Sequence, residues 1–269
     1  MNEKFEKKYY ADFDGDGISE KIRIIYTFTN IVSIQINKND KIIDQWNIDG
    51  QLINTEGNIW GDIDNDNIKE LFVFTWSNNN IILNYFNPLV EESKVQKRII
   101  SDFKPRFVNG DKSGIGCTIH ILNFTDQNND GYKELYFTTE ISFATHPRKM
   151  FAYDFTNNKL HSSPKSCAGL NTIGSYDIDG DGELEFIGTS NAVGNCKPDD
   201  PFSDIYSWLM VFDKEMNFKF QPIKLGDYPS NSKFVKLKTK EGISLVCLNV
   251  HTGANKHHSK IYVFNSHVG

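Results

Sequence analysis

The sequence predicts an all-β protein built from repeats, and three observations lead to that prediction. An acidic nine-residue segment recurs four times, at residues 12–20, 62–70, 126–134 and 177–185. Each copy is followed directly by a run of β-branched and aromatic residues, which favour strands. No amphipathic helical pattern of ten or more residues is found along the chain. Strands that repeat without helices indicate one recurring β unit.

The strands follow the acidic segments in order. The first runs are KIRIIYTF, ELFVFTW, ELYFTTEI and EFIGT, and a second run follows in each repeat: IVSIQIN, IILNYFN, MFAYDF and DIYSWLMVFD. Turn clusters at 77–80 and 156–158 bound several of these runs. The segments start 50, 64 and 51 residues apart, a period that suits four-stranded blades. We therefore expect residues 1–269 to form a single β-propeller domain.

A fifth, degenerate copy is expected in residues 234–250, with its loop near 236–244. Its loop positions 1, 3 and 5 carry Lys236, Lys238 and Lys240, whose charges would replace that of a cation. The five repeats permit a closed five-bladed ring whose last blade is shared between the two ends of the chain. They equally permit a segment of a larger propeller, and the sequence leaves both open.

Composition excludes some functions and leaves the compartment open. The 269 residues carry a formal charge of −6, which does not suit nucleic-acid binding. No apolar run is long enough to span a membrane. The first residues, MNEKFEKKYY, lack the apolar region of a signal peptide. The chain is therefore either cytosolic or a segment of an exported protein.

The acidic segments have the chemistry of a hard-cation site. Positions 1, 3, 5 and 9 carry oxygen ligands, and the backbone carbonyl of position 7 adds another, which suits calcium better than magnesium. An EF-hand is excluded, because its last acidic ligand stands at position 12 between helices. The expected ligands are Asp12, Asp14, Asp16, Ile18, Glu20, Asp62, Asp64, Asp66, Ile68, Glu70, Asp126, Asn128, Asp130, Tyr132, Glu134, Asp177, Asp179, Asp181, Glu183 and Glu185.

This spacing resembles the FG-GAP calcium-binding repeats of integrin α-subunit propellers, called the VCBS type in bacterial surface proteins. The resemblance covers residues 5–265 and implies calcium in the hairpin of each blade, bound by positions 1, 3, 5 and 9. The chain departs from the family at Asn128, a neutral ligand, and at Asn67, where glycine is usual, and its FG and GAP tripeptides are barely recognisable. The first and fourth loops match the pattern best.

Four copies of one site indicate a structural metal, since a catalytic site would normally occur once beside a base or nucleophile. We expect up to four structural Ca²⁺ ions and no catalytic or cofactor-binding residues. The alternative is that the loops are polar turns without metal. Their clustered carboxylates would then repel one another, at a cost on the order of 1 kcal/mol for each close pair.

Other candidates carry less specific signals. His251, His257 and His258 could form a metal cluster or a polar loop, and Arg148 beside His146 could bind an anion or lie in a solvated loop. Tyr206 and Trp208 are expected in the core rather than in a ligand platform. The long connections 87–116 and 191–204 are the places where we expect binding elements. A Cys167–Cys196 disulfide is plausible on geometric grounds, and four free thiols are the alternative.

These observations predict a calcium-stabilised β-propeller that works by binding and is not an enzyme. We expect an extracellular or periplasmic module for ligand recognition or adhesion, or the sensing part of a larger membrane-anchored protein, with a protein or glycan as its partner. Weak extracellular-type calcium sites would stay empty in the cytosol, which favours export. The alternative is a propeller hydrolase or lyase acting on a polysaccharide, with calcium as a structural ion.

Overall fold

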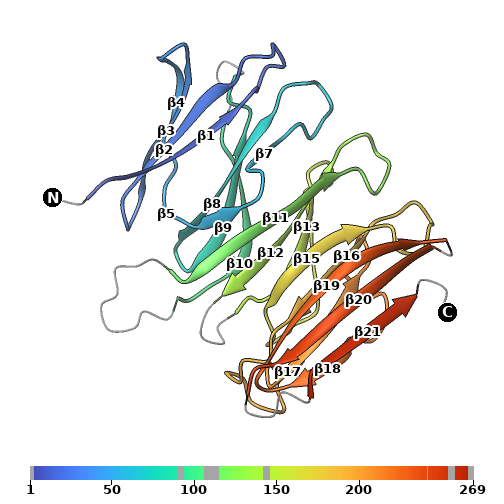
Figure 1. Ribbon diagram of the computed structural model, residues 1–269. Helices are drawn as coiled ribbons and strands as arrows, with labels where there is room; N and C mark the ends of the chain where they lie inside the picture. The colour runs from blue at the N-terminus through green and yellow to red at the C-terminus, as the bar shows by residue number, and fades with distance from the viewer. Residues whose placement is uncertain are drawn as a thin grey trace. The chain divides into compact units, whose positions relative to one another are not determined.

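A computed structural model describes residues 3–89, 94–105, 115–141, 146–240, 242–253 and 258–265. The chain divides into two compact units, residues 1–133 and 134–269. Every named element is a β-strand, so the predicted all-β class is confirmed (Figure 1). Within the described residues, no helix has the length and apolar character needed to cross a bilayer. The single propeller domain stays a prediction.

The described part of the first unit contains eleven strands. They are β1 (Phe5–Ala11), β2 (Glu20–Tyr26), β3 (Ile31–Lys38), β4 (Lys41–Trp46), β5 (Gln51–Leu52), β6 (Asn54–Glu56), β7 (Trp60–Gly61), β8 (Glu70–Ser77), β9 (Asn80–Phe86), β10 (Gln96–Asp102) and β11 (Cys117–Thr125). Strands β1 to β4 form an antiparallel meander, in which each strand pairs with the next. A second sheet has the order β10-β9-β8-β5, with β7 also paired to β8.

The strand that precedes β8 is interrupted, which the sequence did not indicate. Strands β5 and β7 both pair with β8, whereas β6, which lies between them in the chain, pairs in parallel with β11. Gly57 follows β6 with a φ of +94°, in the left-handed region that favours glycine. This glycine lets the chain leave one sheet and return to it at β7.

Among the residues of the second unit that the structure describes, there are ten strands. They are β12 (Glu134–Ile141), β13 (Met150–Asp154), β14 (Lys159–Ser162), β15 (Leu170–Tyr176), β16 (Glu185–Ser190), β17 (Tyr206–Phe212), β18 (Ile223–Asp227), β19 (Ser230–Thr239), β20 (Gly242–His251) and β21 (Lys260–Asn265). Strands β12 to β14, β15 to β18 and β19 to β21 are antiparallel meanders. The predicted strand runs are therefore confirmed in each repeat.

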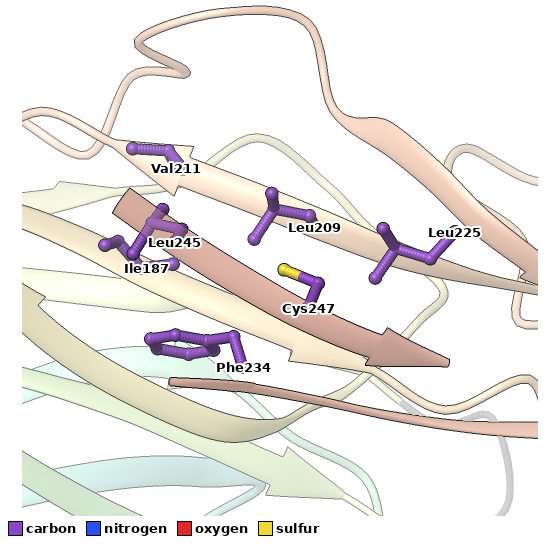
Figure 2. Packing of buried hydrophobic residues seen from close by; sticks show 7 residues of the cluster. All are labelled: Ile187, Leu209, Val211, Leu225, Phe234, Leu245 and Cys247. Atoms are coloured by element: carbon purple, nitrogen blue, oxygen red, sulfur yellow. The ribbon is translucent and has the colours of Figure 1, made fainter. Parts of the chain in front are cut away.

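The core of the second unit lies between two of these sheets (Figure 2). Side chains from β16, β17 and β18 meet side chains from β19 and β20 in one buried cluster: Ile187, Leu209, Val211, Leu225, Phe234, Leu245 and Cys247. The opposite face of the β19–β21 sheet exposes apolar side chains, including Val235, Ile261 and Val263. Alternation along each strand thus places one face in the core and the other at the surface.

The fifth repeat forms a hairpin but lacks the expected loop. In the first repeat Ala11 pairs with Glu20 and the loop lies between them, whereas Thr239 pairs with Gly242 at the corresponding place. Lys236 and Lys238 therefore lie in β19 rather than in a loop. The sequence alignment without gaps could not represent this shortening of the loop to two residues.

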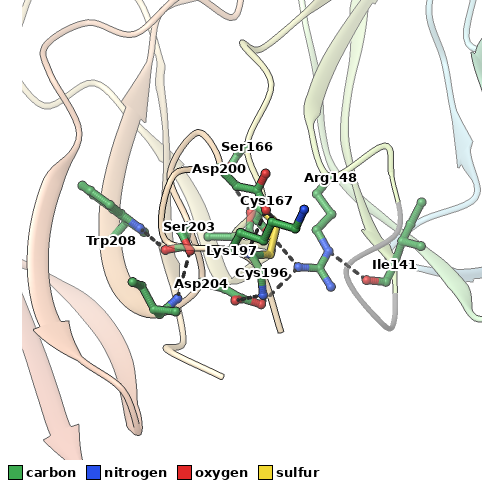
Figure 3. The surroundings of a disulfide bond; sticks show 12 residues. Ile141, Arg148, Ser166, Cys167, Cys196, Lys197, Asp200, Ser203, Asp204 and Trp208 are labelled. Atoms are coloured by element: carbon green, nitrogen blue, oxygen red, sulfur yellow. Dashed lines mark hydrogen bonds and ion pairs between the residues drawn. A yellow bond between two sulfur atoms is a disulfide. The ribbon is translucent and has the colours of Figure 1, made fainter. Parts of the chain in front are cut away.

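The predicted disulfide is confirmed (Figure 3). Cys167 precedes β15 and Cys196 follows β16, so the disulfide connects these two neighbouring strands at the end away from the acidic loop. The Cα atoms of the two cysteines are 6.3 Å apart. The other two cysteines, Cys117 and Cys247, are free and buried. The alternative of four free thiols is thereby excluded for this structure.

Buried charges surround the disulfide (Figure 3). Arg148 and Asp204 are 7% and 1% exposed and form an ion pair at 3.5 Å between Nη1 and Oδ2. The Nε of Arg148 donates to the carbonyl of Ile141 at 3.0 Å, and its Nη1 donates to the carbonyl of Cys167. The backbone N–H of Cys196 donates to Asp204 Oδ1 at 2.7 Å. Arg148 is thus engaged within the fold rather than displayed to an anion.

Candidate functional site

The four acidic segments fold into loops with the same backbone conformation. Positions 4 and 6 have positive φ in every loop, a conformation that glycine and asparagine adopt at the least cost. The residues are Gly15, Gly17, Asn65, Asn67, Asn129, Gly131, Gly180 and Gly182. Asn67 has a φ of +70°, so it forms the same turn as the glycines at position 6 of the other three loops.

The same hydrogen bonds recur in the loops. In the first loop, the N–H of Gly17 donates to Asp12 at 2.9 Å, that of Asp16 to Asp14 at 3.2 Å, and that of Ile18 to Asp16 at 2.8 Å. The second, third and fourth loops repeat all three bonds at the same positions. Asn128 takes part through its amide oxygen, so a neutral side chain still supports the turn.

The glutamate at position 9 of each loop is buried at the start of the strand that follows the loop. Glu20, Glu70 and Glu185 open β2, β8 and β16 and are 0%, 7% and 2% exposed. The N–H of position 2 donates to each of these carboxylates at 2.9, 3.0 and 2.9 Å. Glu134 opens β12 and is also buried, while Asp126 and Asp130 lie in the last loop of the first unit.

Three loops bring their carboxylates close enough to share one ion. In each, one oxygen from every member lies within 4.8 Å of the others, and the groups are Asp12, Asp14 and Glu20; Asp62, Asp64 and Asp66; and Asp177, Asp179 and Glu185. The Oδ1 atoms of Asp12 and Asp62 are buried and have no hydrogen-bond partner among the described residues. A buried carboxylate oxygen without a partner is costly, and a bound cation would satisfy it. The donor set therefore fits a hard cation.

Lysines at position 8 connect neighbouring loops, which sequence reasoning missed. The N–H of Lys69 donates to the carbonyl of Phe13 at 3.0 Å, and its Nζ donates to the carbonyl of Asp12. Lys133 repeats the arrangement one loop later, with its N–H on the carbonyl of Ile63 and its Nζ on that of Asp62, both at 2.7 Å. The recurrence of lysine at position 8 of the second and third loops was the sequence signal that could have indicated these contacts.

Charge is balanced differently in the individual loops. A hydrogen bond from Lys38 lowers the pKa of Asp14, and one from Lys219 lowers the pKa of Asp179. In the second loop, burial is the main cause that raises the pKa of Glu70 to about 7, and the nearby Asp64 adds to it. Burial and the charge of Asp66 also raise the pKa of Asp64. In the second loop, burial and neighbouring carboxylates thus oppose ionisation of Glu70 and Asp64, and no lysine among the described residues lowers these two pKa values.

The metal-free protein is therefore expected to lose stability as the pH rises. Glu70 holds its proton more tightly when folded than the unfolded value of 4.5, so its contribution is present below about pH 4.5 and is lost as the pH rises through about 7. The charges of Asp64 and Asp66 act on Glu70, and Asn87 donates to it, so deprotonation adds charge beside these two acids. We expect a loss on the order of 2 kcal/mol between pH 5 and 8.

Urea unfolding in metal-depleted buffer at several pH values measures this loss. The Glu70→Gln variant should flatten the profile, because its side chain cannot titrate. The lowered pKa values of Asp14 and Asp179 act at more acidic pH and leave this window unaffected. The same pH slope in wild type and variant would show that Glu70 is not its origin.

The remaining candidates lie apart from the loops. His251 and His258 have ring centroids 5.6 Å apart, and His257 lies outside the described residues. Tyr206 and Trp208 are half-buried on β17, where the Nε1 of Trp208 donates to the carbonyl of Ser203 at 3.0 Å. The 87–116 connection supplies β10, and residues 90–93 and 106–114 within it lie outside the described part. The 191–204 connection folds around Cys196 and Asp204.

Comparisons with known proteins add no functional assignment. No family model matches the chain, and no curated protein matches it. Among solved structures, hydrazine synthase of Kuenenia stuttgartiensis is similar at a TM-score of 0.42 and 11% identity. That alignment covers 90% of this chain and 62% of the hydrazine synthase chain, which is less than two thirds. A likeness at this TM-score carries no argument about fold or activity.

Proposed function

We propose that this chain is a calcium-stabilised binding module of the β-propeller type, whose acidic loops hold structural Ca²⁺. The observation that carries the proposal is a pair of buried carboxylate oxygens, Oδ1 of Asp12 and of Asp62, which have no hydrogen-bond partner among the described residues. Calcium accepts six to eight oxygen ligands in flexible geometry, which suits a site formed by one tight turn. Bound calcium would neutralise the carboxylates and hold the turn onto the adjacent strands.

The arrangement of strands supports the propeller as the finer architecture. The first and fourth loops each connect the first two strands of a four-stranded antiparallel meander, β1 to β4 and β15 to β18. The bridges from Lys69 and Lys133 place successive loops of the first unit side by side. Neighbouring blades with equivalent hairpins at one edge would produce these contacts.

The disulfide supports an exported location. Disulfides persist in oxidising compartments and are rare in the cytosol. The Cys167–Cys196 bond therefore favours an extracellular or periplasmic module, where calcium is also abundant enough for weak sites. We propose recognition of a protein or glycan as its role, either alone or as part of a membrane-anchored protein. Binding to a glycan array in calcium and its loss in EGTA would support a calcium-ordered recognition surface.

Thermal and urea unfolding in about 2 mM calcium and in excess EGTA tests the metal. A site with a dissociation constant near 0.1 mM should add about 2 kcal/mol at that concentration. The stabilisation should shrink in an Asp64→Ala variant, which lacks one ligand of the second loop. Magnesium at the same concentration is the control, and it should stabilise less because it requires a stricter octahedron. Identical unfolding curves in calcium and EGTA would refute the proposal.

A further inference from the structure

A lysine side chain lies among the carboxylates of the first loop. Lys38 is the last residue of β3, and the pairing of Lys21 with Asn37 places it opposite Glu20. Its Nζ lies 2.8 Å from Asp14, 2.6 Å from Asp16 and 3.0 Å from Glu20. An ammonium group has three donors, and here each faces a different carboxylate at loop position 3, 5 or 9.

The fourth loop holds a lysine in the same relation, but from a different place in the chain. Lys219 follows β17, and its Nζ lies 2.7 Å from Asp179 and 3.9 Å from Asp181 and also forms an ion pair with Glu185. The residue opposite Glu185 in the strand pairing is Asp213, so Lys219 is not the equivalent of Lys38. Two unrelated lysines thus reach the same three loop positions.

The second loop has no such cation. The residue opposite Glu70 is Asn87, whose Nδ2 lies 3.5 Å from Glu70 Oε1. In the part of the chain that the structure describes, no lysine or arginine pairs with the carboxylates of this loop. Its own Lys69 turns away and donates to the carbonyl of Asp12.

We propose that Lys38 and Lys219 are built-in counter-ions of the first and fourth loops, which compete with calcium, whereas the second loop depends on calcium for its counter-charge. The inference deepens the proposed function and rests on it, since it concerns which loops the ion occupies. A divalent cation placed a few ångströms from an ammonium is strongly repelled, so the lysine must leave before calcium enters. The first and fourth loops can therefore keep their shape without metal, although they match the family pattern best.

Calcium titration of the whole chain by isothermal calorimetry tests this assignment. Lys38→Met and Lys219→Met keep the aliphatic stem and remove the charge. Each variant should tighten calcium binding at its loop at least about tenfold, which appears as one additional tight site relative to wild type. Each should also be less stable than wild type in EGTA, because the loop carboxylates then lack a counter-ion.

Lys224→Met is the matched control. Lys224 lies in β18 and pairs with Asp227 at 2.8 Å, so its charge belongs to an ion pair outside the four loops. This variant should bind the same number of calcium ions as wild type, with the same affinity. Removal of a second-loop ligand by Asp64→Ala should abolish a site that is occupied in wild type.

The outcomes separate the two proposals. If wild type binds calcium but Lys38→Met and Lys219→Met gain neither a site nor affinity, the counter-ion assignment is wrong and the calcium proposal stands. The assignment is also wrong if Asp64→Ala leaves every wild-type site intact. If neither wild type nor the variants bind calcium, the proposed function fails and the inference fails with it.

Discussion

Replacement of Arg148 by leucine is expected to lower the free energy of unfolding by about 3–5 kcal/mol, among the largest effects of a single substitution in this chain. Asp204 is 1% exposed, and Arg148 is the cation beside its Oδ2. Without the guanidinium, the carboxylate remains buried without a counter-charge. The carbonyls of Ile141 and Cys167 also lose their donor.

Urea unfolding under oxidising conditions, followed by circular dichroism, measures this effect. The matched control is Arg23→Leu, which breaks the ion pair with Glu6 on the surface of the β1–β4 sheet. Exposed pairs contribute at most about 1 kcal/mol, so this variant should remain close to wild type. Addition of Asp204→Leu to Arg148→Leu should recover part of the loss, because the unpaired charge is removed. Equal losses in the two arginine variants would contradict the role of Arg148.

Gly57→Ala is expected to destabilise the first unit by about 3 kcal/mol. The residue has a φ of +94°, and an added Cβ would lie 2.5 Å from the carbonyl oxygen of Ile121. Two costs combine there, because an L-residue is strained at that φ and the obstructing atom belongs to the backbone of β11, which cannot turn aside. The departure of β6 from its sheet to β11 depends on this close approach.

Gly17→Ala separates the two costs. Gly17 has a φ of +84°, and no atom lies within 4 Å of an added Cβ, so only the conformational strain of about 1 kcal/mol remains. Both variants should be compared with wild type by urea unfolding in EGTA, which keeps calcium from contributing. A Gly57→Ala variant no less stable than Gly17→Ala would show that the backbone at Ile121 can move.

The parts of the fold that could be predicted from sequence are those set by local chemistry. Alternating oxygen ligands with glycine or asparagine at positions 4 and 6 specify the loops, since the turn and its hydrogen bonds lie within nine residues. The strands after each loop follow from their β-branched and aromatic residues. The disulfide could be anticipated because Cys167 and Cys196 flank two strands that had to be neighbours.

The features that sequence reasoning missed depend on contacts between distant residues. Lys38 reaches Asp14 only through the register of β2 and β3, and Lys219 approaches the fourth loop from beyond β17. The short turn of the fifth hairpin also escaped, because a gapless alignment placed lysines where the structure continues the strand. The detour of β6 depends on a parallel pairing with β11, and no local pattern near Asn54 encodes it.

The lysine bridges between loops have a consequence for cooperativity. Lys69 is held within the second loop yet donates to the carbonyl of Asp12, which belongs to a candidate ligand of the first. Whatever orders the second loop must therefore alter the free energy of ordering the first, and thermodynamic linkage makes that influence mutual. Lys133 extends the same linkage to the carbonyl of Asp62. We therefore expect the calcium sites proposed for these loops to be coupled, so that occupancy of one would change the affinity of the next.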